Sequence, residues 1–343
     1  MRPLRYVSVC SGIEAATVAW HPLGWVPLMF AEIAKFPSRV LAHHYPQVPN
    51  AGDFTTIRDV PGVDLLVGGT PCQSFSLAGL RGGLADDRGN LALEFMRLAD
   101  RLRPRWLLWE NVPGVLSSNG GRDFGSILGA LGELGYGFAY RILDAQFFGV
   151  PQRRRRVFVV GYLGDWRRAA AVLFERESLR GDSQALRVAR DSAPRSVVAL
   201  SQNSRDEVRT SDVMPALTGG GGKPGQGYPA VAFHATQSPI SGPLAPALGA
   251  NGANGVYVPP VSYALTCHAA KMGDPTTDNY VSPSSGRVRK LTPRECERLQ
   301  GFPDDYSMIP GASDSARYHA LGNSMAVPCM AWIGKRISQV EAI

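Results

Sequence analysis

Apolar positions in roughly the first 165 residues occur in short blocks, and two spacings alternate along this part of the chain. Mostly apolar runs, typical of buried strands, cover residues 6–9, 27–31, 65–68, 106–110, 136–143 and 156–161. Segments with helical spacing lie between them, at residues 13–23, 37–44, 91–101 and 124–134. The alternation predicts the α/β class, with a doubly wound, mostly parallel sheet whose ligands bind at the carboxyl ends of the strands.

The pattern changes twice after residue 165. Residues 166–286 begin with a basic segment and continue rich in Gly, Ser, Thr, Asn and Pro, with short β-like pieces such as 231–233 and 255–258. Residues 287–343 return to helical spacing, with Thr292 placed to cap a helix that starts at Pro293 and a last helix after Pro328. We therefore predict a catalytic domain at 1–165, an inserted domain at 166–286 and a C-terminal part at 287–343 that completes the first. A flexible linker is the alternative for the Gly-rich and Ser-rich stretch.

Composition narrows the class of protein. The 343 residues are 44% hydrophobic and 19% charged, an ordinary globular balance, and no apolar run is long enough to cross a bilayer. The N-terminus lacks a secretory apolar region, so we expect a cytoplasmic protein. The five cysteines are odd in number and form no CxxC pair, which disfavours both a disulfide framework and a metal site.

Positive charge is concentrated in one part of the chain. The net charge is +7, and arginines cluster at positions 141, 153–156, 167, 168, 176, 180, 187, 190 and 195. Such a cluster favours a polyanionic partner, most simply a nucleic acid. A solvated basic face is the alternative.

The run GGTPCQSFS, residues 68–76, places a thiol directly after an apolar strand. Its two glycines allow unusual backbone dihedrals, and Pro71 restricts the direction in which Cys72 leaves the turn. A small buried thiol is the usual fate of a cysteine. Because polar Gln73, Ser74 and Ser76 follow it, we predict instead that Cys72 is a reactive group at the strand end.

A nucleoside-type cofactor is indicated by the turn after the first strand. Gly12 is the only glycine there, and Glu14 occupies the region where a phosphate would bind, so NAD and ATP are disfavoured. S-adenosyl-L-methionine has no phosphate and carries positive charge, and it fits better. Glu32 could hold ribose hydroxyls, and Asp53 the adenine amino group while Phe54 packs on the ring; both acids could also be plain surface residues.

A carboxylate and two arginines follow on later strands. Glu110 comes directly after apolar residues 106–109, and desolvation there raises the pKa of a glutamate, which can then share a proton with a ring nitrogen. Arg154 and Arg156 share one face of an extended strand. A basic strand edge that blocks aggregation is the alternative.

Five segments in order resemble the motif series of the cytosine-5 DNA methyltransferases. They are TPCQSFS (70–76), WENVPG (109–114), QRRRRVFVVG (152–161), RKLTPRECERLQGFPDDY (289–306) and HALGNSMAVP (319–328). The resemblance spans residues 7–328 apart from the middle region. One departure is Cys10, which stands where the family usually has an aromatic residue and which puts the stacking of the adenine in doubt.

The resemblance implies a role for each matching residue. Cys72 would add to C6 of a cytosine that has left the base stack, and Glu110 would hydrogen-bond N3 and the exocyclic amine. Arg156 would contact the cytosine O2, and Arg154 would help to hold the nucleophile loop and the base. The positions that match the S-adenosyl-L-methionine pocket are Ser11, Gly12, Ile13, Glu32, Ile33, Asp53, Phe54, Asn323 and Ser324.

The resemblance also implies partners. Residues 166–286 would be the target-recognition domain of an enzyme that acts as a monomer on double-stranded DNA, either beside a separate restriction endonuclease or as a solitary phage or host methylase. A tRNA cytosine-5 methyltransferase and a catalytically silent DNA-binding regulator are the alternatives. Amino-methylating enzymes are disfavoured, because they carry an Asp/Asn-Pro-Pro-aromatic tetrad at this strand end rather than a cysteine.

Overall fold

The computed structural model describes residues 2–71, 91–174 and 291–343, together with the backbone of five short strands between residues 198 and 290. Cys72 and the rest of 72–90 therefore lie outside the described residues, as does most of the inserted domain. Within the described part, none of the helices has the length and apolar character needed to cross a membrane.

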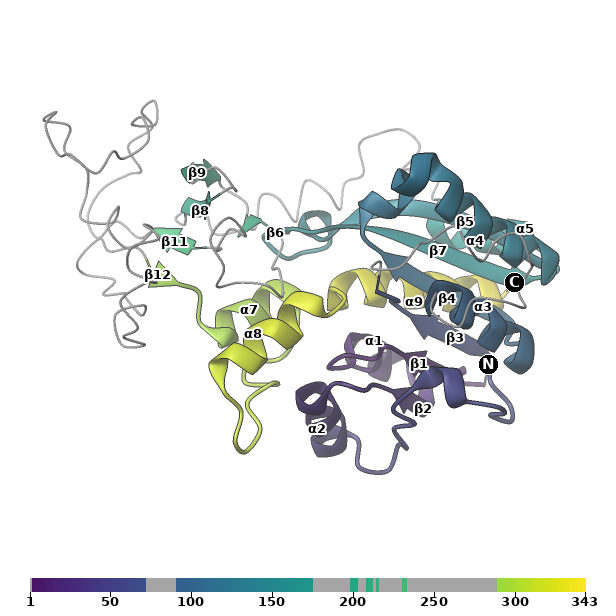
Figure 1. Cartoon of the computed structure of the whole chain (residues 1–343), viewed down its shortest axis with the longest axis horizontal. Coiled ribbons are helices and arrows are strands. Elements are labelled where there is room, and N and C mark those ends of the chain that lie inside the picture. The colour runs from purple at the N-terminus through teal and green to yellow at the C-terminus, as the bar shows by residue number, and fades with distance from the viewer. Residues whose placement is uncertain are drawn as a thin grey trace, which may run out of the picture.

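A six-stranded sheet forms the centre of the molecule (Figure 1). Its strands are β1 (Arg5–Val9), β2 (Val26–Ala31), β3 (Leu65–Gly68), β4 (Trp106–Asn111), β5 (Tyr136–Asp144) and β7 (Arg155–Leu163). They lie in the order β2-β1-β3-β4-β7-β5, with β7 antiparallel to both of its neighbours and the other pairs parallel. All six predicted strands and the mostly parallel sheet are confirmed.

Helices cover both faces of the sheet, because successive strand residues point to opposite sides. On one side, Tyr6, Leu65 and Leu108 belong to a core shared with α1 (Ala15–Trp20), α5 (Trp166–Leu173) and α9 (Val327–Glu341). On the other side, Val7, Leu66 and Leu107 pack with α3 (Leu91–Leu102) and α4 (Arg122–Glu133). The remaining early helix is α2 (Lys35–His44).

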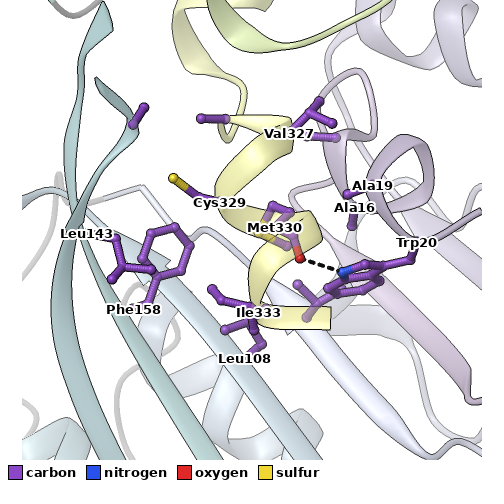
Figure 2. Packing of buried hydrophobic residues seen from close by; sticks show 14 of the residues in the cluster. Ala16, Ala19, Trp20, Leu108, Leu143, Phe158, Val327, Cys329, Met330 and Ile333 are labelled. Atoms are coloured by element: carbon purple, nitrogen blue, oxygen red, sulfur yellow. Dashed lines mark hydrogen bonds between the residues drawn. The ribbon is translucent and has the colours of Figure 1, made fainter. Parts of the chain in front are cut away.

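The C-terminal helix α9 is part of the first core. Figure 2 shows the indole of Trp20, on α1, donating a hydrogen bond from Nε1 to the carbonyl oxygen of Met330 at 2.8 Å. A Cβ added at Gly334 would lie only 2.4 Å from the Trp20 ring, so glycine is needed for this close approach. The two ends of the chain are thereby joined on one face of the sheet.

Helix boundaries differ from the predicted ones at several places, and α2, predicted at 37–44, begins two residues earlier at Lys35. The segment predicted as one helix over 13–23 is α1 followed by a 3₁₀ turn (His21–Leu23), and α1 begins only at Ala15 because Gly12 and Glu14 have φ of 57° and 67°. The helix predicted at 124–134 is α4, which starts two residues earlier. The last helix, α9, begins at Val327 with Pro328 in its first turn.

The C-terminal part carries two further helices, α7 (Pro293–Gln300) and α8 (Asp314–Asn323). Thr292 caps α7 as predicted, and the Glu295 side chain completes a capping box with it.

Short strands are described in the region of the insert. β8 (Val198–Gln202), β9 (Val208–Ser211), β11 (Ala230–Ala232) and β12 (Arg289–Lys290) form a sheet in the order β12-β11-β8-β9, and β10 (Met214–Pro215) pairs with β6 (Gln152–Arg153). The predicted β-like piece at 231–233 overlaps β11. The piece at 255–258 lies outside the described residues.

Candidate active site

The loop after β1 is tightly folded against the end of β2. Cys10, Gly12 and Glu14 all have left-handed backbone conformations, with φ of 49°, 57° and 67°. The Ser11 amide donates to the carbonyl oxygen of Ala31 at 3.2 Å, and the Gly12 amide donates to Glu32 Oε2 at 2.8 Å. The loop therefore has a defined shape at the carboxyl edge of the sheet.

A pocket at this edge joins the two ends of the chain. Its walls are formed by Ser8, Cys10, Ser11, Gly12, Glu14, Ala15, Ala16, Gly69, Glu110, Asn323, Ser324 and Met325. The charged residues in this set are two glutamates, and none is a lysine or arginine. The described walls thus suit a ligand that carries positive charge, as S-adenosyl-L-methionine does.

Glu110 lies at the end of β4, where it is 9% exposed. Burial raises the pKa of this carboxyl group above its ordinary value, and the nearby positive charges of Arg156 and Arg154 oppose the rise. The Arg156 Nε atom is 3.1 Å from Glu110 Oε1, because antiparallel β7 runs beside β4. A carboxyl group in this setting can hold a proton and donate it in a hydrogen bond to a ring nitrogen.

Arg154 is almost completely buried and holds the C-terminal segment in place. Its guanidinium donates to the carbonyl oxygens of Gly322 at 3.2 Å and Ser324 at 2.5 Å, at the C-terminal end of α8. Burial lowers its pKa to about 9, and the neighbouring charge of Arg156 acts in the same direction. Both arginines thus act on Glu110, although Arg154 lies between β6 and β7 rather than in one strand with Arg156 as predicted. Arg154 also positions two wall residues of the pocket, Asn323 and Ser324.

The turn that leads to Cys72 is described as far as Pro71. The Trp109 Nε1 atom donates to Thr70 Oγ1, and the Asn111 Nδ2 atom donates to the Thr70 carbonyl oxygen, each at 3.0 Å. A Cβ on Gly69 would lie 3.0 Å from Glu110 Oε2, so a side chain there would crowd the carboxylate. The chain therefore enters residue 72 from a point fixed against the strand of Glu110.

Sequence reasoning missed this positioning role of Trp109 and Asn111. Both flank Glu110 in the WEN run, and that adjacency was the available signal.

The described cysteines are poor nucleophiles. Burial raises the pKa of the Cys10 and Cys296 thiols to about 12 and that of Cys329 still further. The thiolate is the reactive form, so these three groups stay protonated and unreactive at neutral pH. Cys72 and Cys267 are the two cysteines outside the described residues.

Five of the residues predicted to bind the cofactor are absent from the pocket walls. The side chains of Ile13 and Phe54 are 0% and 4% exposed and belong to the two cores, so both residues contribute to packing, and their part in cofactor binding stays a prediction. The Glu32 carboxylate accepts from the amides of Gly12 and Ala34. Asp53 caps a 3₁₀ turn through the Thr55 amide at 2.9 Å, and Ile33 is 78% exposed. Glu32 and Asp53 nevertheless lie near the wall residue Cys10, because their charges help to raise the pKa of its thiol.

Known proteins match nearly the whole chain. The profile of the family described as C-5 cytosine-specific DNA methylase covers residues 4–339. The chain is 34% identical to a protein of Escherichia phage P1 named DNA N-6-adenine-methyltransferase, over 99% of this chain and 62% of that protein. It is 31% identical to the type II methyltransferase M.SsoII of Shigella sonnei, over 97% of this chain and 79% of that one.

A solved structure shares the fold. The crystal structure of Spodoptera frugiperda DNMT2, in a triple-mutant form, superposes with a TM-score of 0.61 at 19% identity, covering 98% of this chain and 99% of that one. At this identity the likeness concerns the fold alone. The profile match along the chain shows that this protein belongs to the family of C-5 cytosine-specific DNA methylases, the S-adenosyl-L-methionine-dependent DNA (cytosine-5-)-methyltransferases.

Proposed function

We propose that this chain methylates C5 of a cytosine flipped out of double-stranded DNA, through a covalent bond between Cys72 and C6 of the base. The observation that carries the proposal is the anchoring of the Thr70-Pro71 turn to the strand of Glu110. That anchoring fixes the described end of the turn, directly before Cys72, beside the strand of Glu110.

Each group has a definite part in the proposed reaction. The Cys72 thiolate adds to C6, and Glu110, whose pKa is raised by burial, hydrogen-bonds N3 and stabilises the charge that develops on the ring. Arg156, 3.1 Å from Glu110, holds this carboxyl group and contacts the base at O2. S-adenosyl-L-methionine bound in the pocket would supply an electrophilic methyl group to C5 and would leave as S-adenosyl-L-homocysteine. Loss of the C5 proton and departure of the thiolate then restore the aromatic ring.

The choice of cysteine rests on elimination as well as on position. Three of the five thiols are held protonated by burial, which leaves Cys72 and Cys267. Of these two, Cys72 directly follows a described turn that is fixed beside Glu110.

The DNA-binding arrangement follows from the same proposal. Residues 166–286 would form the target-recognition domain between the two parts of the catalytic domain, 1–165 and 287–343, on one DNA duplex bound by a monomer. Not all of the basic cluster is available for this, because Arg141 and Arg168 donate to the carbonyl oxygens of Leu173 and Val340 and so hold α5 and α9. A separate cognate endonuclease is compatible with this arrangement, and so is a solitary methylase in the cytoplasm of a bacterium or phage host.

The phage P1 relative makes adenine a second candidate base. Its printed name concerns adenine N6, and the chain covers 62% of that protein. The Asp/Asn-Pro-Pro-aromatic tetrad of amino-methylating enzymes does not occur in this sequence. We therefore favour cytosine, and the choice of base is an outcome of the following test.

The test uses labelled S-adenosyl-L-methionine and duplex DNA of many sequences carrying 5-fluorocytosine. Fluorine cannot leave C5 as a proton does, so we expect the enzyme to stall as a covalent adduct that survives denaturation. Cys72→Ser is expected to abolish the adduct, and Cys267→Ser, the matched control, to retain it. An adduct that persists in Cys72→Ser would refute the mechanism. Methyl transfer to adenine alone, or to tRNA alone, would refute the proposal that the substrate is cytosine in duplex DNA.

A further inference from the structure

The carboxylate of Glu14 is buried in the wall of the pocket and only half of it is satisfied. The residue is 1% exposed. Its Oε1 accepts from the Thr17 amide at 3.2 Å and from the Thr17 hydroxyl at 3.1 Å. Its Oε2 has no partner in hydrogen-bond geometry within the described part of the chain, although the Ser8 hydroxyl is near enough to favour the charged form. A buried carboxylate oxygen without a hydrogen-bond partner is unfavourable, and a bound ligand or a proton would satisfy it.

Among the residues that the structure describes, the groups that face Glu14 offer it no positive charge. They come from four elements: Tyr6 from β1, Glu32 from the end of β2, Tyr45 from the end of α2 and Tyr306 from the segment after α7. Cys10 and Glu110 share the pocket wall with it. Burial, with a smaller contribution from the charge of Glu32, raises the pKa of Glu14 to about 7. The carboxyl group is therefore divided between its two protonation states near neutral pH.

We propose that Glu14 is a cofactor-selecting residue: its carboxylate supplies the counter-charge for the positive charge of S-adenosyl-L-methionine in this pocket. The proposal rests on the use of that cofactor and on the geometry of the wall, where a buried oxygen lacks a partner. The cofactor carries two candidate charges, the sulfonium and the α-ammonium group. In a site shielded from water, an opposite charge at contact distance is worth far more than it is at the surface.

A proton-linked affinity follows from this arrangement. When the cation binds, Glu14 must be ionised, so at pH 6.5 the complex forms with release of a proton from this group. The affinity for the cationic cofactor therefore rises with pH through about 7 and levels off above it. A neutral ligand of the same pocket gains nothing from the ionised carboxylate and shows the opposite trend or none.

The test is isothermal titration calorimetry of the full chain without DNA, so that neither Cys72 nor turnover enters the result. Three probes are titrated: S-adenosyl-L-methionine, S-adenosyl-L-homocysteine, which keeps only the ammonium group, and 5′-methylthioadenosine, which has neither charge. The variants are Glu14→Gln, whose amide oxygen can still accept from Thr17, and Glu14→Gly, which suits the φ of 67°. Glu133→Gln, an exposed glutamate at the end of α4, is the control with the same loss of charge.

We expect both Glu14 variants to bind S-adenosyl-L-methionine roughly tenfold or more weakly at pH 8, with 5′-methylthioadenosine unchanged. Proton release at pH 6.5, measured in two buffers of different ionisation enthalpy, should fall sharply in both variants and persist in Glu133→Gln. A parallel loss of S-adenosyl-L-homocysteine binding would assign the contact to the ammonium group, and retention of that binding would assign it to the sulfonium.

Two results would overturn the proposal: unchanged affinity for the cationic cofactor, or an equal loss for 5′-methylthioadenosine. Failure of the unaltered protein to bind S-adenosyl-L-methionine at any pH would instead contradict the proposed function itself.

Discussion

The buried carboxylates of Glu297 and Glu14 lie in two regions with opposite surroundings. Glu297, on α7, accepts from the amides of Asp305 and Ser307 at 2.7 and 2.8 Å, from the Ser307 hydroxyl, and from the Arg317 guanidinium at 3.1 Å. Glu14 has one donor residue, Thr17, on one oxygen and no cation near it in the described part of the chain. The first carboxylate is saturated by the protein, and the second is left open toward the pocket.

This difference in hydrogen bonding distinguishes an acid that stabilises the fold from an acid that is placed to bind a ligand. A buried charge that is fully paired locks the elements around it, here α7, α8 and the segment between them. A buried charge that is incompletely paired costs stability and persists where a ligand can complete it. Glu110 lies between the two, since Arg156 pairs with it while burial still raises its pKa. Substitution of each acid should therefore give a different signature.

The largest effect is expected from Glu297→Gln. Removal of this charge leaves Arg317 buried with weaker partners, which should lower the free energy of unfolding by about 3–5 kcal/mol. Urea unfolding at pH 7.5 measures the change, with Glu133→Gln as a control expected to stay within about 0.5 kcal/mol of the parent. A loss below 1 kcal/mol would remove the contrast with Glu14.

Glu110→Gln is expected to lower the rate of methyl transfer by about 10²- to 10³-fold, because the group that donates to the developing charge on the base is lost. Binding of S-adenosyl-L-methionine should change little, since Gln keeps the size of the side chain. Single-turnover kinetics and calorimetry separate the two quantities. A parallel loss of cofactor affinity would show that Glu110 serves mainly as a pocket wall.

Glu14→Gln should stabilise the cofactor-free protein at high pH. The pKa of Glu14 is about 7 in the folded chain against 4.5 for the free group, so the folded state holds the proton more tightly and the parent loses stability as pH rises from about 4.5 to 7. The variant lacks this loss. The difference in free energy of unfolding between the variant and the parent should therefore shift in favour of the variant by up to about 3 kcal/mol between pH 4 and pH 8. Urea unfolding across this range measures the gain, and a pH-independent difference would contradict the assignment.

The smallest effect on stability is expected from a substitution of the uncharged residue Asn111. Asn111→Ala removes the donor to the Thr70 carbonyl oxygen and should lower the free energy of unfolding by about 1–2 kcal/mol. It should also slow formation of the 5-fluorocytosine adduct, because the turn before Cys72 loses an anchor. Normal adduct kinetics would show that Trp109 alone holds the turn.

Much of the fold was predictable because buried segments show a recognisable pattern of apolar residues within a short stretch of sequence. The six strands, the cap at Thr292 and the carboxylate after residues 106–109 follow from patterns within a few neighbouring residues. The late start of α1 was not predictable, since apolar spacing continues through Ile13 while the backbone at Glu14 turns left-handed. The burial of Ile13 and Phe54 in the two cores was not predictable for a related reason: a motif position says nothing about whether the side chain or the backbone faces the site. Their part in cofactor binding stays a prediction.

By itself the sequence determined the α/β class, the thiol on a turn after the third strand and the motif order that identifies the family. The tertiary structure decided which residues meet. The strand order β2-β1-β3-β4-β7-β5 places Arg156 beside Glu110. The packing of α9 against α1 brings Ser324 and Gly12, from opposite ends of the chain, into the walls of one pocket. It also decided that Glu297 forms an ion pair with Arg317, whereas Oε2 of Glu14 has no hydrogen-bond partner in the described part of the chain. The pKa and the partners of a buried acid depend on packing between segments that are distant in sequence.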